Sequence, residues 1–336
     1  MALNQGLHSL DAPCPRCSKA SVLIAIPCHN EAATITTVIE DFRRHLGDPD
    51  ILVADNGSVD LTSDLALGAG ADVIHVPNVG KGRAVRRLLE HSDHDVTIFV
   101  DGDNTYDPSM ARMLVHLVLC RGYDLVNVAR LSGGEGGEYR RGHQLGNRML
   151  TRLQRGLTGI QLTDILSGYK ALSRRYVASM PLRSKKFQVE VEFAAHAIAL
   201  DMAYVEVPAT YLGRSAGSES KLSTYSDGIA ILRAILRLYR DLKPFQAFAL
   251  LALPWLLASA VLVGIPLDEY LRTGLVQKFP SLIAGVAAFI TGMLLLSTGW
   301  ILDRTQALRR DELALAATSA LRAHKQRRLG DVERPF

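Results

Sequence analysis

Two aspartates one residue apart follow an apolar run in the first third of the chain. The segment Val100–Pro108 reads VDGDNTYDP and comes directly after Val96–Phe99, so Asp101 and Asp103 stand at the end of an expected strand. Like charges this close repel unless water or a positive group screens them. A solvated turn, a basic side chain or a divalent cation would each relieve the repulsion. Mg²⁺ characteristically takes one or two protein carboxylates and completes its shell with water and substrate phosphate.

Two more polar clusters follow apolar runs earlier in the chain. Pro27–Glu31 reads PCHNE and Asp55–Asp60 reads DNGSVD. Both clusters suit turns and helix N-caps as well as ligand-binding loops. Lys81 stands between two glycines at an expected helix start, a reasonable place for contact with a phosphate or a base. The long glycine spacing and the Lys-Ser/Thr pair of a Walker loop are absent.

Short β-branched runs alternate with amphipathic segments from Ser21 onward. We expect strands at Val22–Ile26, Ile51–Ala54, Val73–Val76, Val96–Val100, Leu125–Ala129 and Tyr204–Val207. We expect helices at Ala32–His45, Leu61–Leu67, Gly82–His91, Pro108–Arg121, Leu145–Leu157 and Val189–Leu200. This rhythm is typical of an α/β fold with a mostly parallel sheet covered on both faces. Ligands bind beyond the carboxyl ends of such strands, which is where all three polar clusters fall.

The chain becomes apolar after Asp241. Pro244–Leu267 and Ser281–Leu302 contain no charged residue, and each exceeds the roughly 20 residues that cross a bilayer core. Basic residues flank the outer ends of this pair: Arg233, Arg237, Arg240, Lys243, Arg304, Arg309, Arg310, Lys325, Arg327 and Arg328. The positive-inside rule therefore predicts a multi-pass protein of the plasma (inner) membrane whose large N-terminal domain is cytoplasmic.

Cysteine usage and net charge are less informative. Cys14 and Cys17 have zinc-ligand spacing, but a tetrahedral structural site needs four ligands and no second pair follows. We therefore expect a reduced leader without regular structure, and no disulfide framework involving Cys28 or Cys120. The net charge of +4 over 336 residues does not indicate a nucleic-acid partner.

Taken in order, these motifs resemble the family 2 glycosyltransferases with a GT-A fold, from Ser21 to about Ile235. The resemblance implies a Rossmann-like domain in which Asp101 and Asp103 bind Mg²⁺ or Mn²⁺ against the diphosphate of a sugar nucleotide. It implies a wider set of nucleotide-sugar-binding residues: Pro27, Asn30, Glu31, Asp55, Asn56, Ser58, Lys81, Asp101 and Gly102. Thr105 stands where related enzymes often have Gln, so the metal shell is expected to differ.

The second half resembles the polyprenyl-phosphate glycosyltransferases, a group similar to the dolichol-phosphate mannosyltransferases. The likeness is carried by Tyr139–His143, Thr163–Lys170, Gln188–Glu192, Gly217–Leu222 and the apolar hairpin. It implies inverting transfer of a hexose, from a donor of the UDP-glucose or GDP-mannose type, to a polyprenyl phosphate. The implied catalytic residues are Asp103, Asp164 and Glu190. The candidates for holding the acceptor phosphate are Arg140, Lys170, Arg174, Arg214 and Lys221.

These expectations divide the chain into five parts and leave alternatives open. The parts are a leader at 1–20, a cytoplasmic GT-A domain at 21–220, an amphipathic membrane-surface helix at 221–243, two transmembrane helices at 244–302 and a charged cytoplasmic tail at 303–336. The same donor chemistry could serve another lipid or glycan, in which case Asp164 or Glu190 would be needed as general base. A non-catalytic nucleotide-sugar-binding membrane scaffold is the alternative of another class. A homo-oligomer is favoured.

Overall fold

The computed structural model describes residues 15, 17–131, 162–181, 189–210, 233, 236–237 and 239–332. The chain forms two compact units: one combines Met1–Ala234 with Leu313–Phe336, and the other is Ile235–Glu312.

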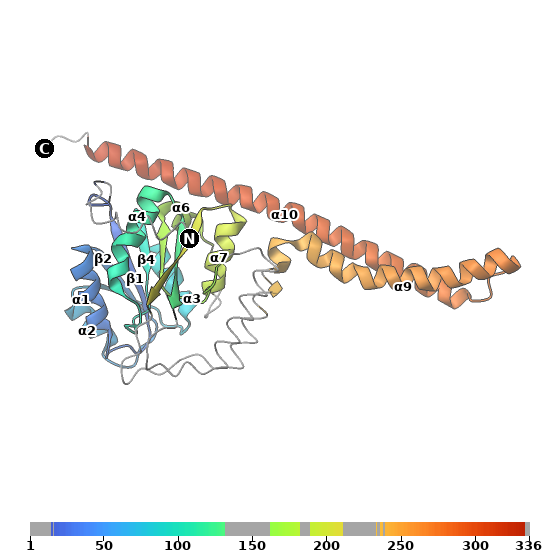
Figure 1. Ribbon diagram of the computed structural model, residues 1–336, viewed down its shortest axis with the longest axis horizontal. Helices are drawn as coiled ribbons and strands as arrows, with labels where there is room; N and C mark the ends of the chain where they lie inside the picture. Colours follow the sequence, from blue (N-terminus) through green and yellow to red (C-terminus); the bar gives the residue numbers. More distant parts are fainter. Residues whose placement is uncertain are drawn as a thin grey trace. The chain divides into compact units, whose positions relative to one another are not determined.

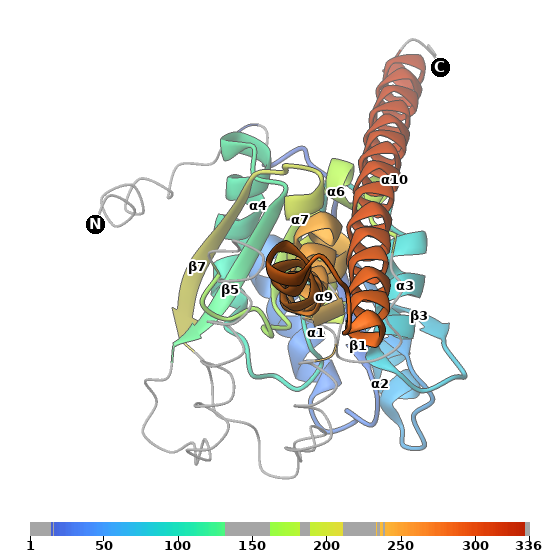
Figure 2. The same cartoon turned by 90° about the vertical axis from the view of Figure 1, so that its right-hand side faces the viewer.

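A seven-stranded sheet forms the centre of the first unit (Figure 1). Its strands are β1 (Val22–Cys28), β2 (Asp50–Asp55), β3 (Asp72–His75), β4 (Val96–Phe99), β5 (Leu125–Leu131), β6 (Lys170–Ser173) and β7 (Tyr204–Thr210). They lie in the order β3-β2-β1-β4-β6-β5-β7, and only β6 among these strands is antiparallel to its neighbours. Figure 2 shows the longest paired strands, β5 and β7, side by side. The prediction of a mostly parallel sheet is confirmed.

Helices cover both faces of the sheet because each presents one apolar side to it. The helices are α1 (Ile35–Leu46), α2 (Thr62–Gly68), α3 (Lys81–Glu90), the 3₁₀ turn η2 (Pro108–Met110), α4 (Ala111–Arg121), α6 (Arg174–Ser179) and α7 (Val189–Ala199). Buried side chains of α1, α2 and α4 pack on one face, and those of α3, α6 and α7 on the other. Ile39 and Leu114 represent the first layer and Leu88 and Phe193 the second, each 1% exposed or less. Helices α1, α2 and α3 each carry the chain back along the sheet between parallel strands, so β1 to β4 end at the same edge.

All six predicted strands are present, but one short strand and one helix were missed. The segment Lys170–Ser173, for which no strand was predicted, is β6, inserted between β4 and β5. Four residues headed by a lysine give too short a pattern to recognise, and the inward position of the lysine depends on a partner elsewhere in the chain. Helix α6 follows at once, capped by the Ser173 hydroxyl, which accepts a hydrogen bond from the Tyr176 N–H. The predicted helix at Leu145–Leu157 lies outside the described residues.

The second unit contains two long apolar helices, α9 (Pro244–Thr273) and the part of α10 (Phe279–Val332) that ends at Glu312. Both are long and apolar enough to cross a membrane. Many of their leucines face outward: Leu250, Leu257 and Leu294 are each at least 60% exposed. Such exposure is unfavourable in water and suits lipid, so the two helices indicate membrane association.

Three glycines of α10, at seven-residue intervals, let it pack closely on α9. A Cβ at Gly285, Gly292 or Gly299 would come within 2.6–2.7 Å of α9 side chains. Small residues at such a spacing are the usual means of close helix contact in lipid, where apolar burial gives little driving force. The Ser281 hydroxyl adds a hydrogen bond to the Leu262 carbonyl oxygen at 2.9 Å. The predicted hairpin is therefore present, and α10 continues as a helix into the predicted tail.

Candidate functional site

The three polar clusters meet at the carboxyl edge of the sheet, as predicted. Cys28, the last residue of β1, is paired in register with Asp55, the last residue of β2. On the other side of β1, Ala25 is paired with Phe99 at the end of β4, two residues before Asp101. Parallel strands end at one edge, so the loops after β1, β2 and β4 are neighbours there.

The loops after β1 and β2 are joined by hydrogen bonds that involve predicted nucleotide-binding residues. The Asn30 N–H donates to the Ser58 hydroxyl at 2.9 Å, and the Asn30 side-chain oxygen accepts from the Val59 N–H at 2.8 Å. Asn30 has a φ of +53°, a left-handed conformation that asparagine tolerates better than most residues. The Glu31 N–H donates to the Thr62 hydroxyl at 2.9 Å. These bonds hold Asn30, Glu31 and Ser58 together at one rim of the site.

Asp55 is a buried carboxylate at the end of β2. It accepts hydrogen bonds from the Ser58 N–H at 3.0 Å and the Ser63 hydroxyl at 2.7 Å, and His75 lies 3.4 Å away. Burial opposes its ionisation, but these hydrogen bonds outweigh burial and lower the pKa of Asp55. Asp55 is therefore an anionic acceptor at neutral pH, as required for binding the N–H groups of a nucleotide base.

Asn56 positions the next loop rather than facing the site. It is 3% exposed. Its amide nitrogen donates to the Val76 and Asn78 carbonyl oxygens at 3.0 and 2.8 Å, and its oxygen accepts from the Gly80 N–H at 2.5 Å. These hydrogen bonds account for the Asn56 side chain, and a nucleotide contact by Asn56 stays a prediction. Gly80 has a φ of +148°, which only glycine adopts readily, and the helix that follows begins at Lys81.

Four alternating charges form a chain of ion pairs from the loop after β4 to helix α7. The Lys81 ammonium lies 2.6 Å from Asp101 Oδ1 and 2.8 Å from Glu190 Oε1. The other oxygen of Glu190 lies 3.0 Å from the ammonium of Lys170. Lys170 also donates to the Ser167 carbonyl oxygen. The four charges sum to zero, which allows this much charge to be buried beside the core.

The chain of charges answers the question that the aspartate pair raises. Burial alone would lower the pKa of Lys81, but Asp101 and Glu190 outweigh burial and raise it well above its ordinary value. Lys81 is therefore a fixed cation that screens Asp101. Of the three ways to relieve the repulsion, the described residues supply the basic side chain.

Asp103 and Gly168 both lie close to Asp101. Asp103 is buried and accepts a hydrogen bond from the Thr105 hydroxyl at 2.6 Å, so the unusual threonine orients this carboxylate. A Cβ at Gly168 would overlap the carboxylate of Asp101, which explains the glycine there. The Gly168 N–H donates to the Tyr106 hydroxyl at 2.7 Å, and burial raises the pKa of Tyr106, keeping it neutral.

Asp164 belongs to a second polar cluster at the same edge. Both its oxygens accept from the guanidinium of Arg130, at 2.6 and 2.9 Å. Burial opposes ionisation, but Arg130 outweighs it and lowers the pKa of Asp164. Glu206 accepts from the N–H and hydroxyl of Thr163, and Asn127 donates to the Asp164 carbonyl oxygen. Asp164 is thus a rigid anion, poorly suited to accepting a proton.

The predicted acceptor-phosphate residues have different outcomes. Arg174 follows Ser173, which is paired with Val96 at the start of β4, so Arg174 lies at the opposite edge of the sheet and is ion-paired with Asp93. Lys170 is at the correct edge but only 1% exposed, with its ammonium on Glu190. Arg140, Arg214, Lys221 and the glycine-rich segment at 133–137 lie outside the described residues.

Glu190 points into the site, and Glu192, two residues further along α7, is half-buried. Reasoning from sequence did not single out Arg130, Asn127, Glu206 or Tyr106. The signal for Arg130 was a charged residue directly after an expected strand, at the edge where ligands bind. Tyr106 was visible within the aspartate motif itself.

The aspartate pair fits a hard divalent cation. Asp101 and Asp103 offer carboxylate oxygens one residue apart at a strand end, the donor type that Mg²⁺ and Mn²⁺ prefer. The side chain of Asp101 is 28% exposed, so one face of the pair is open to a ligand. Gly168 has no Cβ to fill the space beside the Asp101 carboxylate.

Comparison with known proteins gives a consistent result. The family model described as "Glycosyl transferase family 2" matches residues 23–180. The chain is 32% identical over 298 residues to glycosyltransferase AglJ of Haloferax volcanii, covering 87% of this chain and 96% of that one. It is 29% identical over 225 residues to undecaprenyl-phosphate mannosyltransferase of Micrococcus luteus, covering 63% and 91%. A crystal structure of glucosyl-3-phosphoglycerate synthase from Mycobacterium tuberculosis, with Mn²⁺, UDP-glucose and phosphoglyceric acid, is similar at a TM-score of 0.55 and 26% identity, covering 66% and 80%.

Proposed function

The chain belongs to glycosyltransferase family 2, and we propose that it transfers a hexose from a nucleotide diphosphate sugar to a polyprenyl phosphate. The balanced chain of charges from Asp101 to Lys170, beside Asp103 at the carboxyl edge, carries this proposal. A nucleotide sugar carries two phosphates. Among the described residues, this is where a pair of carboxylates suited to a divalent cation lies beside a fixed ammonium group, that of Lys81.

The donor would bind across the loops after β1, β2 and β4. Asp55, Ser58 and the Asn30–Glu31 turn would hold the base and ribose. Asp101 and Asp103 would hold Mg²⁺ or Mn²⁺, and a divalent cation there neutralises the charge that develops on the leaving diphosphate. Lys81 holds the Asp101 carboxylate in place by an ion pair, and the Thr105 hydroxyl holds that of Asp103 by a hydrogen bond.

A phosphate acceptor suits the acids of this site better than a neutral hydroxyl does. A phosphate oxygen is already anionic near neutral pH, so it needs little help from a general base. The pKa of Asp164 is lowered by Arg130, and both oxygens of Glu190 already contact ammonium groups. Neither carboxylate is poised to take a proton, as a hydroxyl acceptor would require.

The proposed step is an in-line displacement. An oxygen of the acceptor phosphate forms a bond to the anomeric carbon, while the bond from that carbon to the donor diphosphate breaks. The bonding electrons leave with the nucleoside diphosphate, and the anomeric configuration inverts. The buried carboxylates beside this reaction stay ion-paired: Asp164 with Arg130, and Glu190 with both Lys81 and Lys170.

We further propose that α9 and α10 cross the membrane as a hairpin, with the catalytic unit in the cytoplasm. The apolar lengths of both helices and their outward leucines support insertion. Arg237, Arg240 and Lys243 precede α9, and Arg304, Arg309 and Arg310 follow the apolar part of α10. This excess of positive charge at the two outer ends favours the cytoplasmic side for both.

The test is label transfer in membranes that contain the full chain. The assay supplies Mn²⁺ or Mg²⁺, undecaprenyl phosphate and one labelled nucleotide sugar at a time, and measures label in the organic phase. Label from one donor, lost in Asp103→Asn, is the expected result and identifies the sugar. A parallel arm offers 3-phosphoglycerate, since a similar structure carries phosphoglyceric acid.

Other outcomes would assign another function. Label in the water-soluble arm, or nucleotide release without lipid label, would retain the enzyme and overturn the lipid acceptor. No turnover with any donor, while the chain still binds nucleotide, would favour the non-catalytic scaffold.

A further inference from the structure

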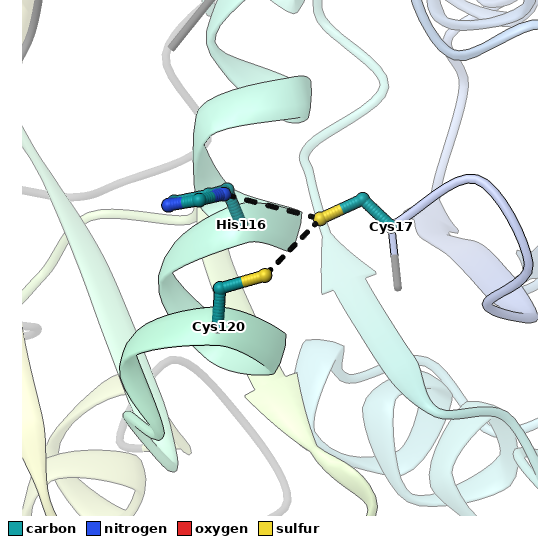
Figure 3. A group of neighbouring side chains, drawn as sticks. All are labelled: Cys17, His116 and Cys120. Carbon is teal, nitrogen blue, oxygen red and sulfur yellow. Dashed lines mark hydrogen bonds between the residues drawn. The ribbon is translucent and has the colours of Figure 1, made fainter. Parts of the chain in front are cut away.

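Three soft metal ligands from two distant parts of the sequence meet at the amino-terminal edge of the sheet. Cys17 lies in a turn five residues before β1, and His116 and Cys120 lie on α4. Their ligand atoms all lie within 4.8 Å of one another (Figure 3). Cys17 Sγ is 3.6 Å from Cys120 Sγ and 4.0 Å from His116 Nδ1.

These separations are close to those between the ligand atoms of a tetrahedral zinc site. Zn–S bonds of about 2.3 Å and Zn–N bonds of about 2.0 Å, at tetrahedral angles, place two sulfurs about 3.8 Å apart and a sulfur and a nitrogen about 3.5 Å apart. The observed sulfur pair differs from this by about 0.2 Å and the sulfur–nitrogen pair by about 0.5 Å. A disulfide would require the two sulfurs to approach to about 2.05 Å and would leave the histidine without a part in the cluster.

The local structure suits a bound cation in two further respects. His116 and Cys120 are four residues apart on one helix, so their side chains share a face and need no rearrangement to act together. Cys120 is the second-last residue of α4, and the carbonyl ends of a helix favour a nearby positive charge. Cys17 packs against the same core cluster as Leu117 and Tyr123, so its turn is held next to α4 without a metal.

We propose that Cys17, His116 and Cys120 bind a zinc ion. Two thiolates and one imidazole are protein ligands of the types that zinc prefers. The zinc would fasten the segment before β1 to the end of α4, the helix that follows the Asp101–Asp107 loop.

The test measures zinc in the purified full chain, carried in detergent and without a histidine tag. We expect about one zinc per chain by mass spectrometry of the metal, and loss of at least nine tenths of it in Cys17→Ser, His116→Gln and Cys120→Ser.

Matched controls separate this site from other cysteines, histidines and acids. Cys28→Ala, His91→Gln and Asp103→Asn should keep the zinc, because none of these residues belongs to the cluster. Should a cluster variant fail to fold, cobalt substitution of the unaltered chain is informative: thiolate-to-cobalt charge-transfer absorption is expected. Absence of zinc after growth with added zinc, or alkylation mapping that finds Cys17 and Cys120 joined as a disulfide, would overturn the proposal.

Discussion

The two edges of the sheet bring together groups of opposite chemical character. At the carboxyl edge, carboxylates and ammonium groups alternate from Asp101 through Lys81 to Glu190, with hard oxygen donors open to a ligand. At the amino-terminal edge, sulfur and imidazole groups of Cys17, His116 and Cys120 converge. The first arrangement keeps charge balanced beside the proposed donor site; the second brings together segments that the sheet alone does not connect. The same sheet therefore positions charged groups suited to catalysis at one edge and groups suited to holding segments together at the other.

The largest expected effect comes from removing one negative charge at the carboxyl edge, which should leave the amino-terminal edge unchanged. Asp103→Asn should lower the rate of sugar transfer by about 10³-fold or more, because several kcal/mol of charge stabilisation at the diphosphate would be lost. The variant should keep its zinc and nearly all its thermal stability, since the side chain keeps its shape and its contact with Thr105. Radiolabel transfer and thermal unfolding measure the two quantities on the same preparation.

Cys120→Ser provides the opposite comparison. This variant should no longer bind zinc. If free zinc is present at about a thousand times its Kd, loss of binding lowers the free energy of unfolding by about 4 kcal/mol. Transfer activity at low temperature should fall only in proportion to the unfolded fraction. If Cys120→Ser instead lost activity as Asp103→Asn does while remaining folded, the division between the edges would be wrong.

How far sequence alone predicts these edges depends on how local the signal is. The strands that end at Cys28, Asp55 and Phe99 are apolar runs followed at once by polar clusters, and that pattern places the carboxyl edge correctly. The zinc cluster joins Cys17 to residues about 100 positions later, and a single histidine and cysteine on a helix give no local signal. Lys170 is similar, because its buried position is understood only with Glu190 in view.

The charge chain at the carboxyl edge can be tested through its central acid. Glu190→Gln would leave the ammonium groups of Lys81 and Lys170 with one carboxylate fewer, and breaking such buried pairs typically costs about 3–5 kcal/mol. We expect a loss of stability of about 3 kcal/mol, together with slower transfer as Lys81 shifts away from Asp101. Chemical denaturation and initial rates would measure the two.

The double variant Glu190→Gln with Lys170→Met should recover part of that stability. It removes the buried ammonium that the single variant leaves unpaired. Equal stability of the single and double variants would show that Lys170 does not depend on Glu190.

Histidine 196 provides a pH-dependent test outside both edges. Burial lowers the pKa of His196 to about 4, whereas an unfolded histidine titrates near 6.5. The unfolded chain therefore gains a proton that the folded chain cannot, and stability falls as the pH decreases from about 6.5 to about 4. At 1.36 kcal/mol per unit this loss is at most about 3 kcal/mol. His196→Gln should flatten this part of the stability profile, and an unaltered slope would assign the acid sensitivity to other groups.

The smallest expected effect tests Arg174, a predicted acceptor-phosphate residue that the fold places at the amino-terminal edge of the sheet. Its partner Asp93 is largely exposed, and its second partner Asp95 is 4.0 Å away, so Arg174→Gln should cost less than about 1 kcal/mol of stability. Lys170 is paired with Phe99 at the carboxyl end of β4, and Ser173 with Val96 at its start. Arg174, the next residue, therefore lies a full strand length away from Lys170. The apparent KM for the lipid acceptor should therefore stay within twofold of its value in the unaltered chain. A tenfold rise in that KM, with stability retained, would mean that the acceptor phosphate reaches the amino-terminal edge, and the separation of the two edges would then have to be abandoned.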